Sequence, residues 1–143
     1  KKIDVITIND EEARQLSGEY SLVKAAQKIC KMGPKYVVIK KGEHGALLFY
    51  DGKVFFAPAL PLEEVFDPTG AGDTFAGGFI GYLAGTHDIS FENMKRGVIY
   101  GSNLASFNVE KFGTQRMEYL TKPEISDRLS EFKQLTQFDI ELQ

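Results

Sequence analysis

The stretch D-P-T-G-A-G-D-T-F, residues 67–75, decides the fold we expect for this chain. Gly70, Ala71 and Gly72 stand where an apolar, strand-like run gives way to a helical pattern. Backbone N–H groups in the first turn of a helix have no intrahelical acceptor and lie at the positive end of the helix dipole. Small residues at this point let phosphate oxygens approach closely, so the stretch predicts an anion-binding helix N-terminus.

Asp73 follows this small-residue run directly. A carboxylate in the first helical turn can accept the proton of a substrate hydroxyl while the backbone amides hold a transferring phosphoryl group. We therefore expect Asp73 to be a catalytic base. A glycine-rich turn in which Asp67 and Asp73 only complement the helix dipole is the alternative interpretation.

The predicted helix carries three further glycines, Gly77, Gly78 and Gly81. Each interior glycine costs about 0.8 to 1 kcal/mol relative to alanine. Close approach of a neighbouring strand, helix or ligand would offset that cost, because a glycine lets two backbones meet where a side chain would collide.

Strand patterns and helix patterns alternate along the rest of the chain. The expected strands are Ile3 to Ile8, Tyr36 to Lys40, Ala46 to Tyr50, Lys53 to Ala57 and Leu62 to Phe66. The expected helices are a short one behind Asn9, then Ser21 to Met32, Gly70 to Ala84, Phe91 to about Val109, and Pro123 to Phe132. This alternation predicts an α/β fold in which a sheet is layered between helices, formed by residues 1–143 as a single domain.

The composition narrows the function classes. The net charge of −3 is spread along the chain without a basic stripe, so nucleic acid is not an expected partner. The apolar runs are too short to cross a bilayer, and the one cysteine, Cys30, is typical of a reducing compartment. We expect a soluble, cytoplasmic protein with no membrane contact.

Other catalytic motifs are missing from the sequence. His44 and His87 do not form a zinc pattern, and there is no G-x-S-x-G elbow around a nucleophilic serine. Neither a Walker phosphate loop nor a G-x-G-x-x-G dinucleotide fingerprint fits the G-A-G run.

The run D-P-T-G-A-G-D-T-F-A-G-G-F, residues 67–79, resembles the C-terminal signature of the ribokinase family, also called the PfkB carbohydrate kinases. The resemblance implies a three-layer α/β/α, Rossmann-like fold and ATP with Mg²⁺ as cofactors. It also implies that Asp73 is the catalytic base and that the amides of Gly70, Ala71 and Gly72 form the anion hole.

Two further landmarks precede this signature. Asn9 and Glu12 match the family's N-x-x-E pattern, in which Glu12 would contact magnesium through water. The same pattern is also a capping-box helix start. The segment from Lys41 through Gly42 to Gly45 resembles the family's loop beside the nucleotide, although a plain hairpin turn has the same sequence.

The last landmarks concern adenine and a monovalent cation. The segment 101–113 resembles the helix and loop that border adenine, which makes Asn103 a predicted adenine-pocket residue; an ordinary polar helix position is the alternative. Asp67 and Thr69 match positions where some members bind potassium, a hard cation that prefers oxygen ligands.

The family's N-terminal half, with its substrate motif and β-stranded lid, has no counterpart in this sequence. We therefore expect the C-terminal part of a longer kinase that transfers a phosphoryl group from ATP to a hydroxymethyl group of a sugar. A nucleoside kinase of the adenosine type is the alternative within the fold. The alternative from another functional class is a non-catalytic nucleotide-binding or assembly fragment. A small-molecule substrate is the expected partner, and the longer parent could be a homodimer.

Overall fold

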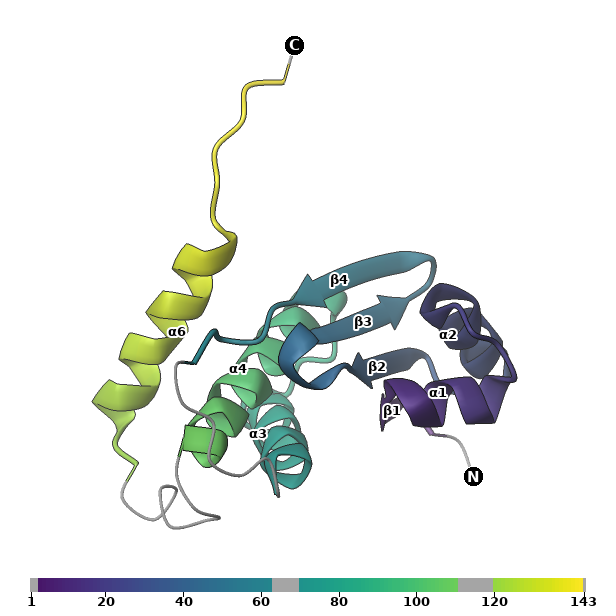
Figure 1. Ribbon diagram of the computed structural model, residues 1–143, viewed down its shortest axis with the longest axis horizontal. Coiled ribbons are helices and arrows are strands. Elements are labelled where there is room, and N and C mark those ends of the chain that lie inside the picture. Colours follow the sequence, from purple (N-terminus) through teal and green to yellow (C-terminus); the bar gives the residue numbers. More distant parts are fainter. Residues whose placement is uncertain (1–2, 63–69, 111–119, 143) are drawn as a thin grey trace.

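A computed structural model of the chain describes residues 3–62, 70–110 and 120–142. Four strands and five α-helices account for most of these residues (Figure 1). In chain order they are β1 (Val5–Asn9), α1 (Asp10–Ser17), α2 (Leu22–Lys31), β2 (Tyr36–Lys40), a 3-10 turn (Gly42–His44), β3 (Ala46–Tyr50), β4 (Lys53–Ala57), α3 (Ala71–Thr86), α4 (Phe91–Glu110) and α6 (Lys122–Thr136).

The four strands form one mixed sheet in the order β1-β2-β3-β4. β1 and β2 are parallel and are joined by α1 and α2, whereas β2, β3 and β4 follow one another as antiparallel hairpins. A parallel pair needs a crossover of this kind, while an antiparallel pair needs only a tight turn. The predicted hairpin between Lys40 and Ala46 is therefore confirmed.

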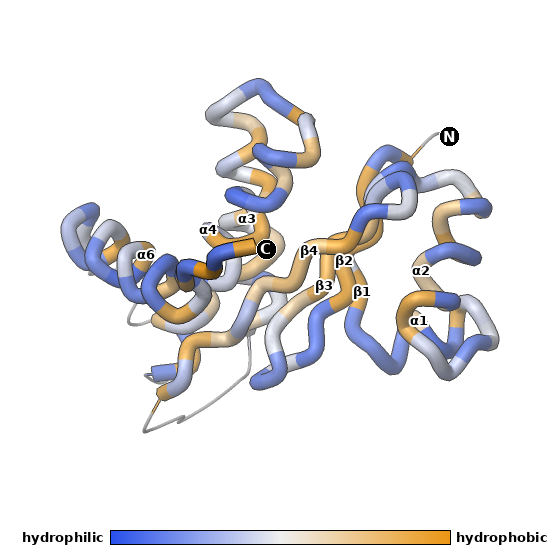
Figure 2. The backbone as a smooth tube through the Cα atoms, turned by 90° about the horizontal axis from the view of Figure 1, so that it is seen from above, coloured by the Kyte–Doolittle hydropathy of each residue, from blue (hydrophilic) through white to orange (hydrophobic). Residues whose placement is uncertain are grey.

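Helices cover both faces of the sheet, as Figure 2 shows. β2 is buried on both sides, and its side chains alternate between two cores. Tyr36 and Val38 face the core made with α3 and α4, while Val37 and Ile39 face the core made with α1 and α2. This alternation follows from the two-residue period of a strand, and it confirms the expected three-layer α/β/α arrangement.

α3 and α4 pack closely because two glycines meet at their crossing. A Cβ atom built on Gly78 would lie 3.2 Å from the Cα of Gly101 and 2.8 Å from Leu104 Cδ1. The expected close approach therefore holds for Gly78. At Gly77 and Gly81 no described atom lies within 4 Å of an added Cβ, so no described strand or helix approaches that closely there, and a ligand contact at these two positions stays a prediction.

α6 is fastened to α4 by Arg128. Its guanidinium donates to Glu110 Oε1 at 2.6 Å and to Ser106 Oγ at 3.1 Å, and it lies 3.7 Å from the centre of the Phe107 ring. Phe132 is buried on the same helix, whereas Phe138, beyond its end, is exposed.

The observed elements differ from the predicted ones mainly at their ends. The first strand begins at Val5 rather than Ile3, and the last helix extends to Thr136 rather than Phe132. Most of the strand expected at Leu62 to Phe66 lies outside the described residues, and Leu62 itself is in no strand. Within the described ranges, no helix combines the length and hydropathy that crossing a bilayer requires.

Candidate functional site

The candidate site begins where the two parallel strands end. Asn9 is the last residue of β1 and Lys40 the last of β2, and the two are direct partners in the sheet register. The carboxyl ends of parallel strands are where α/β sheets bind their ligands. The N-x-x-E residues and the loop after β2 are therefore neighbours, although about 30 residues of chain separate them.

Asn9 and Glu12 form a complete capping box at the start of α1. The Glu12 N–H donates to Asn9 Oδ1 at 2.7 Å, and the Asn9 N–H donates to Glu12 Oε2 at 2.8 Å. The capping interpretation of this pattern is thus confirmed. It leaves Glu12 exposed at the end of β1, with one carboxylate oxygen outside these two bonds.

The loop after β2 is a tight 3-10 turn that depends on glycine. Gly42 and Gly45 have φ angles of +56° and +85°, and the Lys41 N–H donates to the Gly45 carbonyl at 2.7 Å. A Cβ on Gly45 would collide with the carbonyl oxygen of Ala57 on β4. The turn is therefore locked against β4, and it presents Lys41 and Gly42 beside the end of β1 and β2.

The N-terminus of α3 has the open amides that the sequence predicts. Gly70 is its N-cap residue, with φ +82° and no side-chain capping bond. The first intrahelical bond runs from the Thr74 N–H to the Gly70 carbonyl, at 2.9 Å. By helix geometry the N–H groups of Ala71, Gly72 and Asp73 therefore have no acceptor within the helix, and the Asp73 side chain is exposed beside them. Asp67 and Thr69 lie outside the described residues.

Lys40, which sequence reasoning missed, connects the strands to this helix. A Cβ atom built on Gly72 would lie 3.2 Å from the Lys40 ammonium nitrogen, and the same nitrogen is 5.8 Å from the centre of the Phe75 ring. The signal was present in the sequence, since the alternation in β2 puts Lys40 on the face of Tyr36 and Val38. What the sequence lacked was the identity of the helix on that face.

Asn103 packs against α6. Its side chain is fully buried between α4 and α6, where Nδ2 donates to the carbonyl oxygen of Ile125 at 3.1 Å. Oδ1 is buried too and has no hydrogen-bond partner among the described residues. The predicted role of Asn103 in the adenine pocket remains a prediction.

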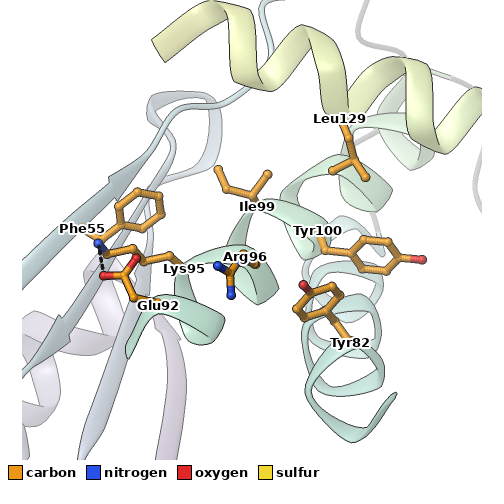
Figure 3. Close-up of a pocket in the computed structure, with 8 residues that line it drawn as sticks. All are labelled: Phe55, Tyr82, Glu92, Lys95, Arg96, Ile99, Tyr100 and Leu129. Carbon is orange, nitrogen blue, oxygen red and sulfur yellow. Dashed lines mark hydrogen bonds and ion pairs between the residues drawn. The ribbon is translucent and has the colours of Figure 1, made fainter. Parts of the chain in front are cut away.

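A cavity of about 400 Å³ lies elsewhere, between β4 and α3, α4 and α6 (Figure 3). Lys95 stands at its wall, ion-paired with Glu92 at 2.9 Å and lying above the Phe91 ring at 4.8 Å. None of the residues predicted from the sequence lines it. In the part of the chain that the structure describes, no group of three or more His, Cys, Asp or Glu residues could hold a metal ion.

The fold and the site define a class of protein. It is an α/β protein in which the N-terminus of α3 and Lys40 lie near the carboxyl ends of two parallel strands, an arrangement typical of phosphate-binding proteins. The model of the pfkB family of carbohydrate kinases matches residues 1–121. The chain therefore belongs to the pfkB family of carbohydrate kinases, as its sequence signature predicts.

Similar proteins include kinases for nucleosides and for sugars. The chain is 44% identical over 87 residues to a cytidine kinase of Thermococcus kodakarensis, and the matched stretch covers 59% of this chain and 31% of that protein. It is 36% identical over 118 residues to the ribokinase of Haemophilus influenzae, and this stretch covers 79% of the chain and 37% of that enzyme. Among solved structures, aminoimidazole riboside kinase from Salmonella enterica matches with a TM-score of 0.75 and 25% identity, over 89% of this chain and 42% of that one. The chain thus spans less than half the length of these relatives.

Proposed function

We propose that this chain supplies the phosphate-binding and catalytic half of a kinase that transfers a phosphoryl group from ATP to a hydroxymethyl group of a sugar. The observation that carries the proposal is the N-terminus of α3. There the amides of Ala71 and Gly72 have no acceptor within the helix, Asp73 is exposed in the same turn, and the Lys40 ammonium lies 3.2 Å from where a Cβ of Gly72 would be.

In this mechanism Asp73 takes the proton of the attacking hydroxyl, a bond forms between that oxygen and the γ-phosphorus of ATP, and the bond from this phosphorus to the bridging oxygen of the leaving ADP breaks. The amides from Gly70 to Gly72 donate to the phosphoryl oxygens, whose charge is spread in the transition state. Positioning and charge stabilisation supply most of the acceleration in such reactions. The donor leaves as ADP, and the acceptor keeps the phosphate.

We propose ATP as the donor and magnesium as the metal ion. The Salmonella enterica enzyme was solved with an ATP analog, which supports ATP as donor here. Magnesium usually keeps several waters and binds through one or two carboxylates together with substrate phosphates. Glu12 is exposed at the carboxyl end of β1 and fits such a water-mediated contact, while the turn from Lys41 to Gly45 would flank the nucleotide. Asp67 and Thr69 remain our proposal for a potassium site.

A nucleoside acceptor is the second candidate. The observation that favours it is the 44% identity to the cytidine kinase, a higher identity over a shorter stretch than that to the ribokinase. Both acceptors offer a primary hydroxyl to the same base. A non-catalytic nucleotide-binding or assembly fragment is the candidate from another class, and it predicts stabilisation by nucleotide without turnover.

Phosphate transfer to a panel of ribose, fructose, adenosine and cytidine tests these candidates. The assay uses the longest polypeptide that contains the chain and, in parallel, the 143 residues alone. Asp73→Asn should lower turnover by about 100- to 10,000-fold, the usual range for a general base, while ATP affinity stays within about twofold. Asp127→Asn, an exposed change on α6, is the matched control. Equal turnover in Asp73→Asn and the parent would contradict the role of Asp73.

A further inference from the structure

β4 is an edge strand with one open side. In the sheet order β1-β2-β3-β4 it pairs with β3 alone among the described residues. In an antiparallel ladder every second residue points its N–H and C=O away from the partner strand, so a row of backbone groups on β4 faces outward. Val54 and Phe56, on the α1/α2 face of this edge, are 51% and 50% exposed. An open edge with exposed apolar side chains is a template for the addition of another strand.

The C-terminal tail, residues 137–142, has the pattern of a strand without a sheet. The apolar Phe138, Ile140 and Leu142 alternate in it with two acidic residues, and all of these side chains are exposed. The tail follows α6 and belongs to no helix or strand. Strict alternation of apolar and charged residues is typical of a strand that buries one face. The tail therefore has an apolar face that the described fold leaves in solvent.

One antiparallel register brings the two apolar surfaces together. It sets Phe138 of the tail opposite Phe56 of β4. Two residues along each strand, Ile140 then comes opposite Val54. Residues that are directly opposite lie on the same face of a sheet, with Cβ atoms about 4.5 to 5.5 Å apart, so both pairs would bury apolar surface. A shift by one residue would instead turn the acidic face of the tail toward these side chains.

The same register pairs opposite charges on the other face of β4. Glu141 comes opposite Lys53, whose ammonium has no carboxylate within 4.0 Å in the described part of the chain. Asp139 comes opposite Phe55, and Lys95 Nζ lies 5.6 Å from the centre of that ring (Figure 3). Lys95 is already paired with a carboxylate of its own helix, so Lys53 has the free charge. Both faces of the tail thus match both faces of this edge.

The tail is directed away from the sheet of its own chain (Figure 1). Arg128 and the buried Phe132 fasten α6 to α4. Gln137 alone joins the last residue of α6, Thr136, to Phe138, and its backbone is extended, with φ −77° and ψ 128°. One residue gives the chain little length in which to turn back. The tail of a second copy approaches β4 without this restraint, and reciprocal exchange of two tails closes a two-fold dimer.

We propose that β4 binds the C-terminal tail of a second copy of this chain as a fifth, antiparallel strand, with Phe138 of one copy opposite Phe56 of the other. Main-chain hydrogen bonds supply affinity in such strand addition, and the alternating side chains select the register. The inference does not depend on the proposed function. It assigns a surface to the homodimer that we expect for the longer parent.

Cross-linking between two cysteine variants tests the exchange. The assay uses the longest polypeptide that contains the chain, with Cys30 and any further cysteine replaced by alanine. Val54→Cys protein is mixed with Ile140→Cys protein and oxidised, and a mass tag on one of them distinguishes the mixed product. In the control mixture Lys24→Cys, exposed on α2, replaces Val54→Cys. The first mixture should cross-link about 10-fold faster than the control or more, because a bound tail raises the effective concentration of its cysteine.

Charge reversal tests the register. In the same assay, Glu141→Lys in the tail or Lys53→Glu in β4 should slow cross-linking by about 3- to 10-fold, since like charges directly opposite each other repel. The two reversals together should restore the original rate. Glu131→Lys, on an exposed position of α6, is the matched control and should leave the rate unchanged. All of these positions are exposed, so the fold does not depend on them.

Equal rates in the two cysteine mixtures, or single reversals that leave the rate unchanged, would overturn the proposal. A chain that carries both Val54→Cys and Ile140→Cys distinguishes the other occupant. If it forms a disulfide within itself while the mixture forms none, the tail folds back on its own β4 and the exchange between copies is excluded. A mixed disulfide that depends on the pair of Lys53 and Glu141 would confirm the exchange.

Discussion

Gly78 of α3 and Gly101 of α4 stand back to back, so that a Cβ on Gly101 would lie 2.7 Å from the carbonyl oxygen of Phe75. Both helices can therefore approach the sheet together, and α3 keeps its N-terminus beside Lys40. The packing of these two helices thus places the N-terminus of α3, where we propose the phosphate site.

Alanine at either glycine should destabilise the protein. Gly78→Ala and Gly101→Ala push the new methyl group into Leu104 or into the Phe75 backbone, which we expect to cost about 1 to 3 kcal/mol in free energy of unfolding. Urea denaturation monitored by circular dichroism measures the change.

The matched control is Gly81→Ala on the same helix. No described atom lies within 4 Å of a Cβ there, so the change should stabilise the protein by about 0.5 to 1 kcal/mol through helix propensity. Similar effects at Gly78 and Gly81 would show that α3 and α4 do not meet as described.

Gly45 should tolerate alanine far less well than Gly52. Both have positive φ angles, +85° and +75°, which alanine rarely adopts, and at Gly45 a ψ angle of −156° adds a conformation that is essentially restricted to glycine. Only at Gly45 would the methyl group also collide with the Ala57 backbone, whereas no described atom lies near it at Gly52. Thermal denaturation should therefore give a clearly lower Tm for Gly45→Ala, and equal Tm values would contradict the packing of the turn against β4.

Asn103→Ala separates two roles of one side chain. Loss of the bond to the Ile125 carbonyl and of buried volume should lower the free energy of unfolding by about 1 to 3 kcal/mol. If Asn103 also contacts adenine, ATP affinity should fall while tripolyphosphate affinity stays constant. If the ratio of the two affinities does not change, Asn103 has only the structural role of stabilising the contact between α4 and α6.

Asp88 should make stability depend on pH at the turn before α4. The Ser90 backbone N–H donates to Asp88 Oδ1 at 2.8 Å, and this bond, reinforced by the Ser90 side chain, holds the pKa of Asp88 below its ordinary value. The stability that the carboxylate adds is therefore present above the unfolded pKa of about 4 and is lost as the pH falls through the lower folded pKa. Asp88→Asn should lower Tm at pH 7, and the gap to the parent should narrow at pH 3. A gap of constant size would exclude this linkage.

Much of the fold could be predicted from local patterns. The strand at Tyr36 to Lys40 and the helix behind Ser21 were found because apolar periodicity and capping residues act within a few positions of the chain. The open amides at Ala71 and Gly72 were found for the same reason, since a helix start is a local feature.

The sequence by itself determined which residues are small, charged or β-branched, and hence where strands, helix starts and the anion-binding stretch fall. Three contacts were decided only by the tertiary structure. The Lys40 ammonium lies beside Gly72, Gly78 contacts α4 whereas no described atom lies within 4 Å of a Cβ on Gly81, and Asn103 is buried against α6. The physical reason is that these contacts join residues far apart in the chain. Their partners depend on which helix covers which face of the sheet, and a periodic pattern fixes the face but not its neighbour.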